Sequence, residues 1–483
     1  MKINYKAVLL VIFLLTFGFR LFIAFTNPTF SSDESYFNLR VTDHIIENKS
    51  PLLYDELSYS GKSLIYPQFF NYFLALFSFI PGYEKIIPAL LISSIVLIVF
   101  LICNKITNNP TASLFSAFLS AFIPIEIKTN INQISVYSLL IPIILLMILC
   151  LLNLDNKKYF NLFIILTFLS PLIHPISFLF SLSLIFYLLL INTESIHITR
   201  AKKEVIVFAF FAILLINFFL YREALIRYGT NIIWQNIPGS LFDDYFNFNI
   251  IEVLYLLGII PLIFGVIGIY TGLFKKKDPD ILLLSSFMLS TLLLMALKLI
   301  NLEVGVLFLS LPLLIASSKT LSNLYYYFSI TKFAKYKKHF NLILFVLIII
   351  LSLIPSFLIA TSLPNYELEK DRFTWIKLNT EPNSVVLAPY DMGNILTYYS
   401  ERKNVVDNNF LLAPNVDERL SDAELIYKSG FEVKALELVE KYKINYIYTS
   451  PEILNRYNLV KIPYVDDSNC FEPVAENVYK VKC

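Results

Sequence analysis

The sequence predicts a polytopic α-helical membrane protein with a small α/β domain at its C-terminus. Hydrophobic residues make up 57% of the 483 residues and gather in long runs, whereas charged residues make up only 16%. Soluble domains carry about 25% charged residues. The charges lie between the apolar runs and after Thr361, as expected for several membrane spans followed by a water-soluble tail.

The apolar runs set the expected number of spans. A helix needs about 20 apolar residues to cross the bilayer, because it rises about 1.5 Å per residue through roughly 30 Å of hydrocarbon. We expect about eleven transmembrane helices within residues 1–361. The expected spans are 6–25, 84–104, 111–125, 134–153, 159–173, 176–191, 204–220, 250–273, 281–299, 304–318 and 340–361. Pro171 and Pro175 leave open whether 159–191 is one broken helix, and 67–80 is expected at the interface.

Basic residues in short loops indicate the orientation, because cytoplasmic loops are enriched in Lys and Arg. With about eleven spans, the Lys and Arg clusters fall on the side of the N-terminus. This pattern predicts a cell-membrane protein with a cytoplasmic N-terminus. The first outer loop (26–66), the loop 221–249 and the tail 362–483 are then extracytoplasmic.

The tail 362–483 is expected to be an α/β domain, because helical and strand patterns alternate along it. Helices are expected near 372–378, 394–399, 417–428 and 431–442, and strands near 384–388, 405–406, 444–449 and 477–482. Cys470 and Cys483 also lie in the tail. An oxidising compartment would allow a disulfide between them, but two free thiols are an equally open alternative, since sequence does not fix the pairing.

Composition argues against several other functions. The net charge is only +2, and no basic stripe with interleaved aromatic residues is present, so no nucleic-acid partner is indicated. No Cys/His spacing is typical of a zinc site. The lipid bilayer is the macromolecular partner that composition indicates.

Two adjacent acids, Asp33 and Glu34, directly follow the first expected span. Carboxylates at a membrane surface are able to accept a proton from an acceptor hydroxyl, or to hold a divalent cation such as Mg²⁺ or Mn²⁺. A plainer alternative is that Asp33 caps the helix that follows it, and that Glu34 interacts with the dipole of this helix.

The residues around this acid pair resemble the first outer loop of the GT-C class of membrane glycosyltransferases. The matching pattern is Asp33-Glu34-x-Tyr36, Arg40, Pro51, Asp55-x-Leu57-Ser58-Tyr59-x-Gly61-Lys62 and Tyr66-Pro67. The class includes oligosaccharyltransferase catalytic subunits, protein mannosyltransferases and lipid A aminoarabinose transferases, which use polyprenyl-phosphate-linked sugars on the outer or lumenal face. The resemblance implies a GT-C-like fold. It also implies that Asp33 is the catalytic carboxylate, with Glu34 beside it. Candidate substrate-binding residues are Tyr36, Arg40 and Asp55.

The tail carries a second resemblance. Pro389-Tyr390-Asp391-Met392-Gly393 occupies the position of the W-W-D-Y-G signature that contacts the acceptor sequon in archaeal oligosaccharyltransferase subunits. Only Asp391 and Gly393 match, and both tryptophans are absent, so sequon recognition is not implied. Asp391 is a candidate substrate-binding residue, and a simple turn before a helix is the alternative.

The second acidic motif of the oligosaccharyltransferase branch is missing from the next outer loop. Lys128 and Thr129 resemble the family's Arg-Ser/Thr pair, but Ser135 and Tyr137 stand where acids are expected. A hard cation prefers several carboxylate ligands, and the acid pair of the first loop alone would be a weak metal site. We therefore expect the first-loop aspartate to act as a base without an obligatory metal.

A polyprenyl-phosphate donor needs cations near the outer surface, since Arg and Lys both bind phosphate. Candidate ligands of the donor phosphate are Arg222, Arg227, Lys128 and Lys298. The alternative for the two arginines is that they snorkel at a helix end. His174 and Gln133 are further substrate-binding candidates, and interhelical hydrogen bonding is the alternative for His174.

These features predict an enzyme that moves a sugar from a polyprenyl-phosphate carrier to an acceptor glycan, lipid or protein on the outer face, with Asp33 as general base. Two alternatives stay open. One is a non-catalytic membrane protein, such as a lipid-sugar flippase, a transporter or a degenerate scaffold, although no internal repeat supports a transporter. The other is an oligosaccharyltransferase proper, which transfers a whole glycan to a sequon.

Overall fold

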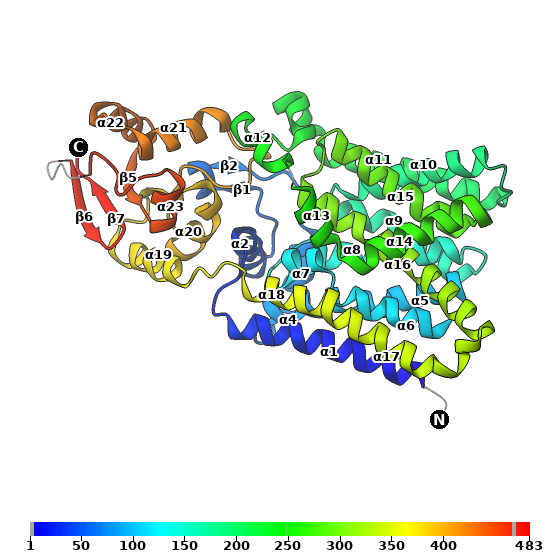
Figure 1. The fold of residues 1–483 in the computed structure, drawn as a ribbon. Coiled ribbons are helices and arrows are strands. Elements are labelled where there is room, and N and C mark those ends of the chain that lie inside the picture. The colour runs from blue at the N-terminus through cyan, green and yellow to red at the C-terminus, as the bar shows by residue number, and fades with distance from the viewer. Residues whose placement is uncertain (1–3, 248, 466–469) are drawn as a thin grey trace. The chain divides into compact units, whose positions relative to one another are not determined.

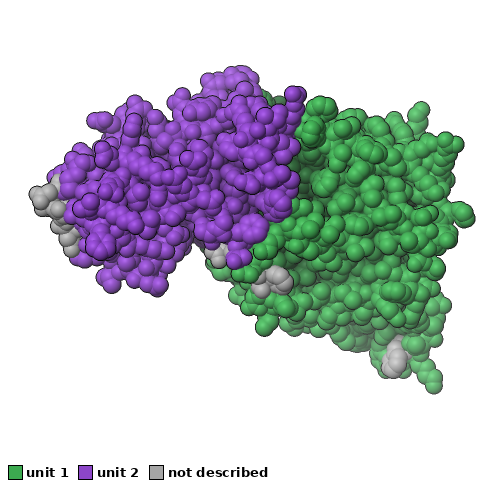
Figure 2. Space-filling model, turned by 90° about the horizontal axis from the view of Figure 1, so that it is seen from above, with its two compact units in different colours: residues 1–26, 67–220, 245–363 green, residues 27–66, 221–244, 364–483 purple. Residues whose placement is uncertain are grey.

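The chain folds into two compact units in the computed structural model, which describes residues 4–247, 249–465 and 470–483. Unit 1 consists of Met1–Thr26, Pro67–Leu220 and Tyr245–Leu363. Unit 2 consists of Asn27–Tyr66, Tyr221–Asp244 and Pro364–Cys483 (Figure 2). The sequence predicted one boundary, between 361 and 362. In the structure, two segments that connect apolar runs also fold with the tail.

Unit 1 is built from helices, as its long apolar runs require (Figure 1). Its helices are α1 (Tyr5–Thr26), α3 (Phe69–Ala75), α4 (Tyr83–Ser93), α5 (Ile95–Thr107), α6 (Pro110–Ser120), α7 (Pro124–Asn130), α8 (Tyr137–Leu152), α9 (Lys157–Ile173), α10 (Ser177–Thr193), α13 (Ile250–Leu257), α14 (Ile259–Tyr270), α15 (Pro279–Ala296), α16 (Leu302–Ile330), α17 (Lys337–Ile348) and α18 (Ile354–Thr361). Helix α11 (Arg200–Tyr228) begins in unit 1 and ends in unit 2.

Seven helices in the described part of the chain are long and apolar enough to cross a membrane, or eight if the bent pair α6–α7 forms one broken span. All the expected apolar runs are helical, but α8, α9 and α10 have only 16, 17 and 17 residues. The stretch 159–191 forms two separate helices, α9 and α10. Within 67–80, α3 covers seven residues, and its Phe70 is buried.

Helix α16 lies at the centre of unit 1 and contacts α5, α6, α14 and α15. Two glycines allow α14 to approach it. A β-carbon on Gly265 would lie 2.4 Å from the carbonyl oxygen of Leu313, and one on Gly268 would lie 2.2 Å from that of Ala316. Close packing through small residues stabilises helix pairs in lipid, where burial of apolar surface gives no driving force.

Unit 2 contains a five-stranded sheet with the order β4-β3-β5-β7-β6. Strand β3 pairs in parallel with β4 and β5, and β7 pairs antiparallel with β5 and β6. The strands are β3 (Val385–Leu387), β4 (Lys403–Asn404), β5 (Ile444–Tyr448), β6 (Phe471–Ala475) and β7 (Val478–Val481). The tail helices are α19 (Glu367–Asn379), α20 (Gly393–Ser400), α21 (Val416–Lys428), α22 (Glu432–Lys441) and α23 (Pro451–Arg456). The four predicted tail helices are confirmed, β4 lies two residues before its expected position, and β6 and α23 were not predicted.

The earlier segments of unit 2 add elements around this sheet. Residues 27–66 form α2 (Asp33–Asn48) and a hairpin of β1 (Tyr54–Asp55) and β2 (Lys62–Ser63) around the turn η1 (Ser58–Ser60). Residues 221–244 contain η2 (Gly229–Trp234) and most of α12 (Gly239–Phe246).

Helix α2 packs against α20 (Figure 1). The fully buried ring of Tyr36 lies 5.6 Å from the ring of Tyr398 and 5.4 Å from that of Tyr399, measured between centroids. This core contact accounts for the position of Tyr36, which the sequence predicted as a substrate-binding residue. It also holds the first turn of α2 against the last turn of α20.

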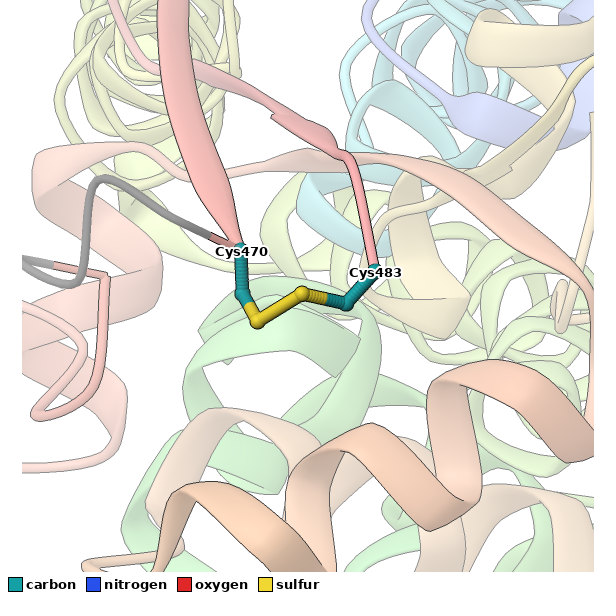
Figure 3. The surroundings of a disulfide bond; sticks show 2 residues. All are labelled: Cys470 and Cys483. Carbon is teal, nitrogen blue, oxygen red and sulfur yellow. A yellow bond between two sulfur atoms is a disulfide. The ribbon is translucent and has the colours of Figure 1, made fainter.

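A disulfide joins Cys470 and Cys483, with their Cα atoms 4.9 Å apart (Figure 3). The bond lies at the open end of the β6–β7 hairpin, where the backbone N–H of Lys482 also donates to the carbonyl oxygen of Cys470 at 2.8 Å. Of the two sequence-based alternatives, the structure therefore has the disulfide.

Candidate active site

The first turn of α2 and the N-terminus of α20 meet at Asp33. Its Oδ1 accepts hydrogen bonds from the backbone N–H groups of Ile395 at 2.8 Å and Asn394 at 3.1 Å. Its Oδ2 accepts one from the side-chain amide of Asn394 at 2.8 Å and a longer one from the Asn394 backbone at 3.3 Å. Asp33 is only 5% exposed. The carboxylate is therefore oriented by a helix end rather than by solvent.

This contact satisfies backbone groups that α20 cannot satisfy itself. The first N–H groups of a helix have no intrahelical partner, and the positive end of the helix dipole attracts a negative charge. Helix α2 begins at Asp33, and its N-cap Ser32 makes no side-chain capping hydrogen bond within the described residues. The alternative that Asp33 caps its own helix does not hold, because its carboxylate instead accepts hydrogen bonds from the start of α20.

Gly393 brings a second acid to the same helix end. A β-carbon on Gly393 would lie 2.4 Å from Cβ of Asp407 and 2.5 Å from the carbonyl oxygen of Val406. Burial raises the pKa of Asp33 well above its usual range, and the charge of Asp407 raises it further. The hydrogen bonds from Ile395 and Asn394 to the ionised carboxylate oppose this rise.

Asn394 is fully buried and uses both of its amide hydrogens. Its Nδ2 donates to Oδ2 of Asp33 at 2.8 Å and to Oδ1 of Asn408 at 2.7 Å. Its own Oδ1 is buried without a hydrogen-bond partner among the described residues. Sequence reasoning missed this residue, and the available signal was its position directly after Gly393.

Glu34 lies beside Asp33 but in a different environment. Its side chain is exposed, and it forms no hydrogen bond or ion pair with any described residue. The surrounding protein nevertheless raises the pKa of the Glu34 carboxyl by desolvation. The two adjacent acids therefore differ: Asp33 is oriented and buried, whereas Glu34 is accessible.

Asp407 also belongs to a buried polar cluster, which we call the Asp407 network. It consists of Ser58, Tyr59, Lys62, Asn404 and Asp407. Ser58 Oγ, Asn404 Nδ2 and Lys62 Nζ contact the Asp407 carboxylate, the last two at 3.1 and 3.4 Å. The hydroxyl of Tyr59 donates to the carbonyl oxygen of Asp407 at 2.7 Å. The network ties the turn η1 to the loop after β4.

The turn η1 has an unusual backbone. Tyr59 and Ser60 have φ values of 53° and 56°, in the left-handed region, and Gly61 follows at 125°. A bulky residue rarely adopts this conformation, and such strain persists where the surroundings fix it. Here the backbone N–H of Tyr59 donates to Asn404 Oδ1 at 2.7 Å. Desolvation lowers the pKa of Lys62, and Asp407 partly offsets this effect.

Arg40 and Asp55, predicted to bind substrate, bind each other. Two hydrogen bonds of 2.6 and 2.7 Å join the guanidinium to the carboxylate. Oδ1 of Asp55 also accepts the backbone N–H groups of Leu57 and Ser58 at 3.1 and 3.2 Å. The pair therefore holds the β1–η1 corner against α2, which accounts for both residues without a ligand.

Asp391 lies in the 3₁₀ turn η6 (Tyr390–Met392), directly before α20. Its two carboxylate oxygens accept from the guanidinium of Arg456 at 3.0 and 2.5 Å. The alternative of a turn before a helix is therefore confirmed for this motif, and its acid is paired.

Lys128 and Gln133 lie in unit 1. Lys128 Nζ forms ion pairs with Glu303 at 2.7 Å and Glu252 at 3.5 Å. Gln133 donates to the backbone carbonyl of Lys128 at 2.9 Å. Two carboxylates already neutralise this lysine, so a phosphate would have to displace them.

His174 and Lys298 also lie in unit 1. His174 follows α9, and its Nδ1 accepts from the backbone N–H of Ile176 at 3.2 Å, which leaves Nε2 to carry the proton of the neutral ring. The ring packs edge-on against Tyr137. Lys298 Nζ lies 5.8 Å from the centre of the Phe246 ring.

The two arginine candidates lie in unit 2, at the end of α11. Arg227 forms an ion pair with Glu223 one turn earlier and approaches Ser63 Oγ at 3.5 Å. Arg222 is exposed and has no ion-pair partner among the described residues. Of the two, Arg222 is the more accessible to an anion.

The acid pair offers a divalent cation few free ligand atoms. Among the described residues, no group of three or more His, Cys, Asp or Glu side chains could hold a metal ion. The oxygens of Asp33 already accept N–H donors from α20, and a hard cation needs several free oxygen ligands.

No protein-family model and no curated protein matches this sequence. Solved structures do match it. The apo oligosaccharyltransferase of Archaeoglobus fulgidus superimposes with a TM-score of 0.73 at 14% identity, covering 94% of this chain and 70% of the other. The same enzyme in complex with an inhibitory peptide and a dolichol-phosphate gives 0.67 at 15% identity, covering 92% and 69%.

A second kind of protein shares the architecture. ArnT from Cupriavidus metallidurans, bound to undecaprenyl phosphate, superimposes with a TM-score of 0.55 at 11% identity, covering 98% of this chain and 97% of the other. The chain therefore has the fold of the GT-C membrane glycosyltransferases, as the sequence predicted. It is a multi-pass membrane protein with a small C-terminal sheet.

Proposed function

We propose that this protein is a membrane glycosyltransferase that moves a sugar from a polyprenyl-phosphate carrier to an acceptor hydroxyl, with Asp33 as the general base. The observation that carries the proposal is the Asp33 carboxylate, which α20 orients in a chain with the GT-C fold. A buried, oriented carboxylate with a raised pKa is the type of group that general-base catalysis uses.

The hydrogen bonds to Asp33 favour Oδ2 as the basic atom. An ionised carboxylate has about four acceptor positions. Three N–H groups occupy these positions. The Ile395 backbone bonds Oδ1, the Asn394 side chain bonds Oδ2, and the Asn394 backbone N–H is shared between the two oxygens, at 3.1 Å to Oδ1 and 3.3 Å to Oδ2. One position therefore remains, on Oδ2, for the hydroxyl of an acceptor.

The proposed reaction is a direct displacement. The acceptor hydroxyl gives its proton to Oδ2 of Asp33 while its oxygen forms a bond to the anomeric carbon of the sugar. The bond between this carbon and the phosphate oxygen breaks, and its electron pair leaves with the polyprenyl phosphate. The phosphate leaves as a stable anion and needs no proton, so one base suffices.

Glu34 is proposed to bind the acceptor, because it is the exposed member of the acid pair. The donor phosphate is proposed to bind Arg222, which has no competing carboxylate in the part of the chain that the structure describes, in preference to Arg227 or Lys128. A lipid-phosphate donor is supported by the dolichol-phosphate and undecaprenyl phosphate in the two structural neighbours.

The reaction is proposed to occur on the extracytoplasmic face. The Cys470–Cys483 disulfide supports this side, because disulfides persist in oxidising compartments and are rare in the cytosol. The distribution of Lys and Arg in short loops supports the same orientation.

Oligosaccharyltransferase activity proper is a second candidate, because the A. fulgidus enzyme gives a higher TM-score than ArnT. The paired Asp391 and the missing tryptophans weigh against recognition of a sequon peptide. Mass spectrometry of the glycosylated acceptor would separate transfer of one sugar to a hydroxyl from transfer of a whole glycan to asparagine.

The central test is turnover by the purified full chain in lipid nanodiscs. Synthetic polyprenyl-phosphate hexoses are supplied with membrane extracts as acceptors, and release of polyprenyl phosphate is measured. We expect turnover by the wild type, a loss of about 10³-fold or more in Asp33→Asn, and a smaller loss in Glu34→Gln. Undiminished turnover in Asp33→Asn with loss in Glu34→Gln would assign the base to Glu34. No turnover of any lipid-linked sugar by the wild type would favour a non-catalytic protein.

A further inference from the structure

We propose that Asn394 is a positioning residue, which holds Oδ2 of Asp33 in the orientation that proton transfer requires. This inference rests on the proposed function, since it concerns the same carboxylate. Asn394 does not reach a substrate in this arrangement, because it is fully buried behind Asp33. It acts through Asp33.

Hydrogen bonding fixes the orientation of the Asn394 amide. Its two closest polar neighbours, Oδ2 of Asp33 at 2.8 Å and Oδ1 of Asn408 at 2.7 Å, are both acceptors. The amide nitrogen has two hydrogens, and each faces one of these oxygens. A flipped amide would set its oxygen against both acceptors, so Asn394 is able to act only as a donor here.

The Asn394 side chain supplies the short hydrogen bond to Oδ2 of Asp33, which the backbone of the helix end does not supply. The two backbone N–H groups that contact Asp33 both lie within 3.1 Å of Oδ1. The short bond to Oδ2 comes from the Asn394 side chain, and the backbone bond to this atom is long, at 3.3 Å. Without the side chain, the carboxylate keeps its anchor at Oδ1 but is able to rotate about it. The proposed basic atom is the one that moves.

The unpaired Oδ1 of Asn394 supports a functional role for this side chain. This oxygen is buried and has no hydrogen-bond partner among the described residues, an arrangement that lowers stability. An apolar residue of similar size would avoid this cost, but it would leave Oδ2 of Asp33 without its donor. Glu34 follows Asp33 in the chain, and the charge of Asp407 acts on Asp33; neither carboxylate is able to replace this donor while ionised.

The test compares two buried polar side chains of unit 2. Asn394→Ala removes the donor to Asp33. Ser450→Ala is the control, because Ser450 is also buried and its Oγ accepts the backbone N–H of Ile453 at 3.2 Å at the start of α23, away from Asp33 and the Asp407 network. Turnover of polyprenyl-phosphate hexose is measured in nanodiscs with the full chain, together with thermal unfolding.

We expect Asn394→Ala to lower kcat by about 10- to 100-fold with little change in either KM, because a misplaced base slows the chemical step without weakening binding. Ser450→Ala is expected to lower the unfolding temperature, because it removes a helix cap, with kcat within about threefold of the wild type. Equal kcat losses in both variants, or a loss that lies in KM, would overturn the inference.

Two further variants keep the outcome decisive. If Asn394→Ala does not fold, Asn408→Ala tests the same arrangement from a half-buried position, by removing the acceptor that holds the second amide hydrogen. It should lower kcat by a smaller factor, and an unchanged kcat would contradict the inference. Asp33→Asn separates a failure of the proposed function from a failure of the positioning role. If Asp33→Asn is fully active, the assignment of Asp33 as base is wrong. If Asp33→Asn is inactive and Asn394→Ala has normal activity, only the positioning role of Asn394 fails.

Discussion

Gly393 and Asp407 approach so closely that a β-carbon on Gly393 would stand 2.4 Å from Cβ of Asp407. Real β-carbons do not approach other atoms to this distance, so a larger residue at 393 must displace the loop after β4 or the start of α20. Either movement reaches Asp33, because its ligands are the next two residues of the helix.

Gly393→Ala is therefore expected to destabilise unit 2 by about 1–3 kcal/mol, the usual cost of overpacking, and to lower kcat. Thermal unfolding and turnover would measure the two effects. Gly430→Ala is a suitable control, since no atom lies within 4 Å of the corresponding β-carbon. Equal stability of the two variants would show that the loop yields to the added methyl group.

The pH dependence of turnover is expected to report on Asp33. A general base works in its ionised form, so kcat/KM falls as the pH decreases through its pKa. Burial and the charge of Asp407 raise the pKa of Asp33, and the hydrogen bonds from Ile395 and Asn394 only partly oppose this. On the acidic side of the pH profile (its acidic limb), kcat/KM should therefore fall at a pH above the usual pKa of aspartate, about 3.9.

Unfolding at low pH would also make kcat/KM fall as the pH decreases. Tryptophan fluorescence and thermal unfolding across the same pH range distinguish the two effects, because a titrating base lowers activity while the fold is intact. An acidic limb at or below about pH 4 in a stable protein would contradict the environment described for Asp33.

The Asp407 network offers a stability prediction. Lys62 and Asp407 are both fully buried at their charged ends and lie 3.4 Å apart. Removing one member of a buried pair leaves the other charge uncompensated, at a cost of about 3–5 kcal/mol. Lys62→Met should therefore lower the unfolding temperature of unit 2 strongly.

Lys482→Met is the matched comparison, because Lys482 pairs with Glu472 at 3.2 Å on the surface. Exposed pairs contribute about 0–1 kcal/mol, so this variant should unfold close to the wild type. If Lys62→Met were equally harmless, desolvation of the lysine would already cancel its attraction to Asp407, in line with the lowered pKa of Lys62.

The sequence predicted those features that depend on local pattern. The apolar runs of unit 1 are helical, and α19 to α22 lie where helical periodicity placed them. The loop after the first span, which two acids and a family pattern marked, holds the buried Asp33 carboxylate. Strand β6 escaped prediction because Phe471–Ala475 includes a proline and has no clear alternation.

The partners of Asp33 could not be predicted in this way. Asn394 lies 361 residues away in the chain, and no local pattern connects it to Asp33. The sequence predicted Arg40 and Asp391 to bind substrate, and in the structure each is paired, with Asp55 and Arg456 respectively. Sequence gives the residue types that chemistry needs, whereas the pairing of charges depends on tertiary packing.

The Cys470–Cys483 disulfide allows a direct test of which side of the membrane unit 2 occupies. Cys470→Ser frees the thiol of Cys483, which lies at the exposed C-terminus, whereas Cys103 and Cys150 are buried. A membrane-impermeant maleimide should label this variant in intact cells and should leave the wild type unlabelled. Labelling only after the cells are broken would place unit 2 in the cytoplasm. Loss of the disulfide, which spans 13 residues, should also destabilise unit 2 by about 3 kcal/mol in the chain-entropy model.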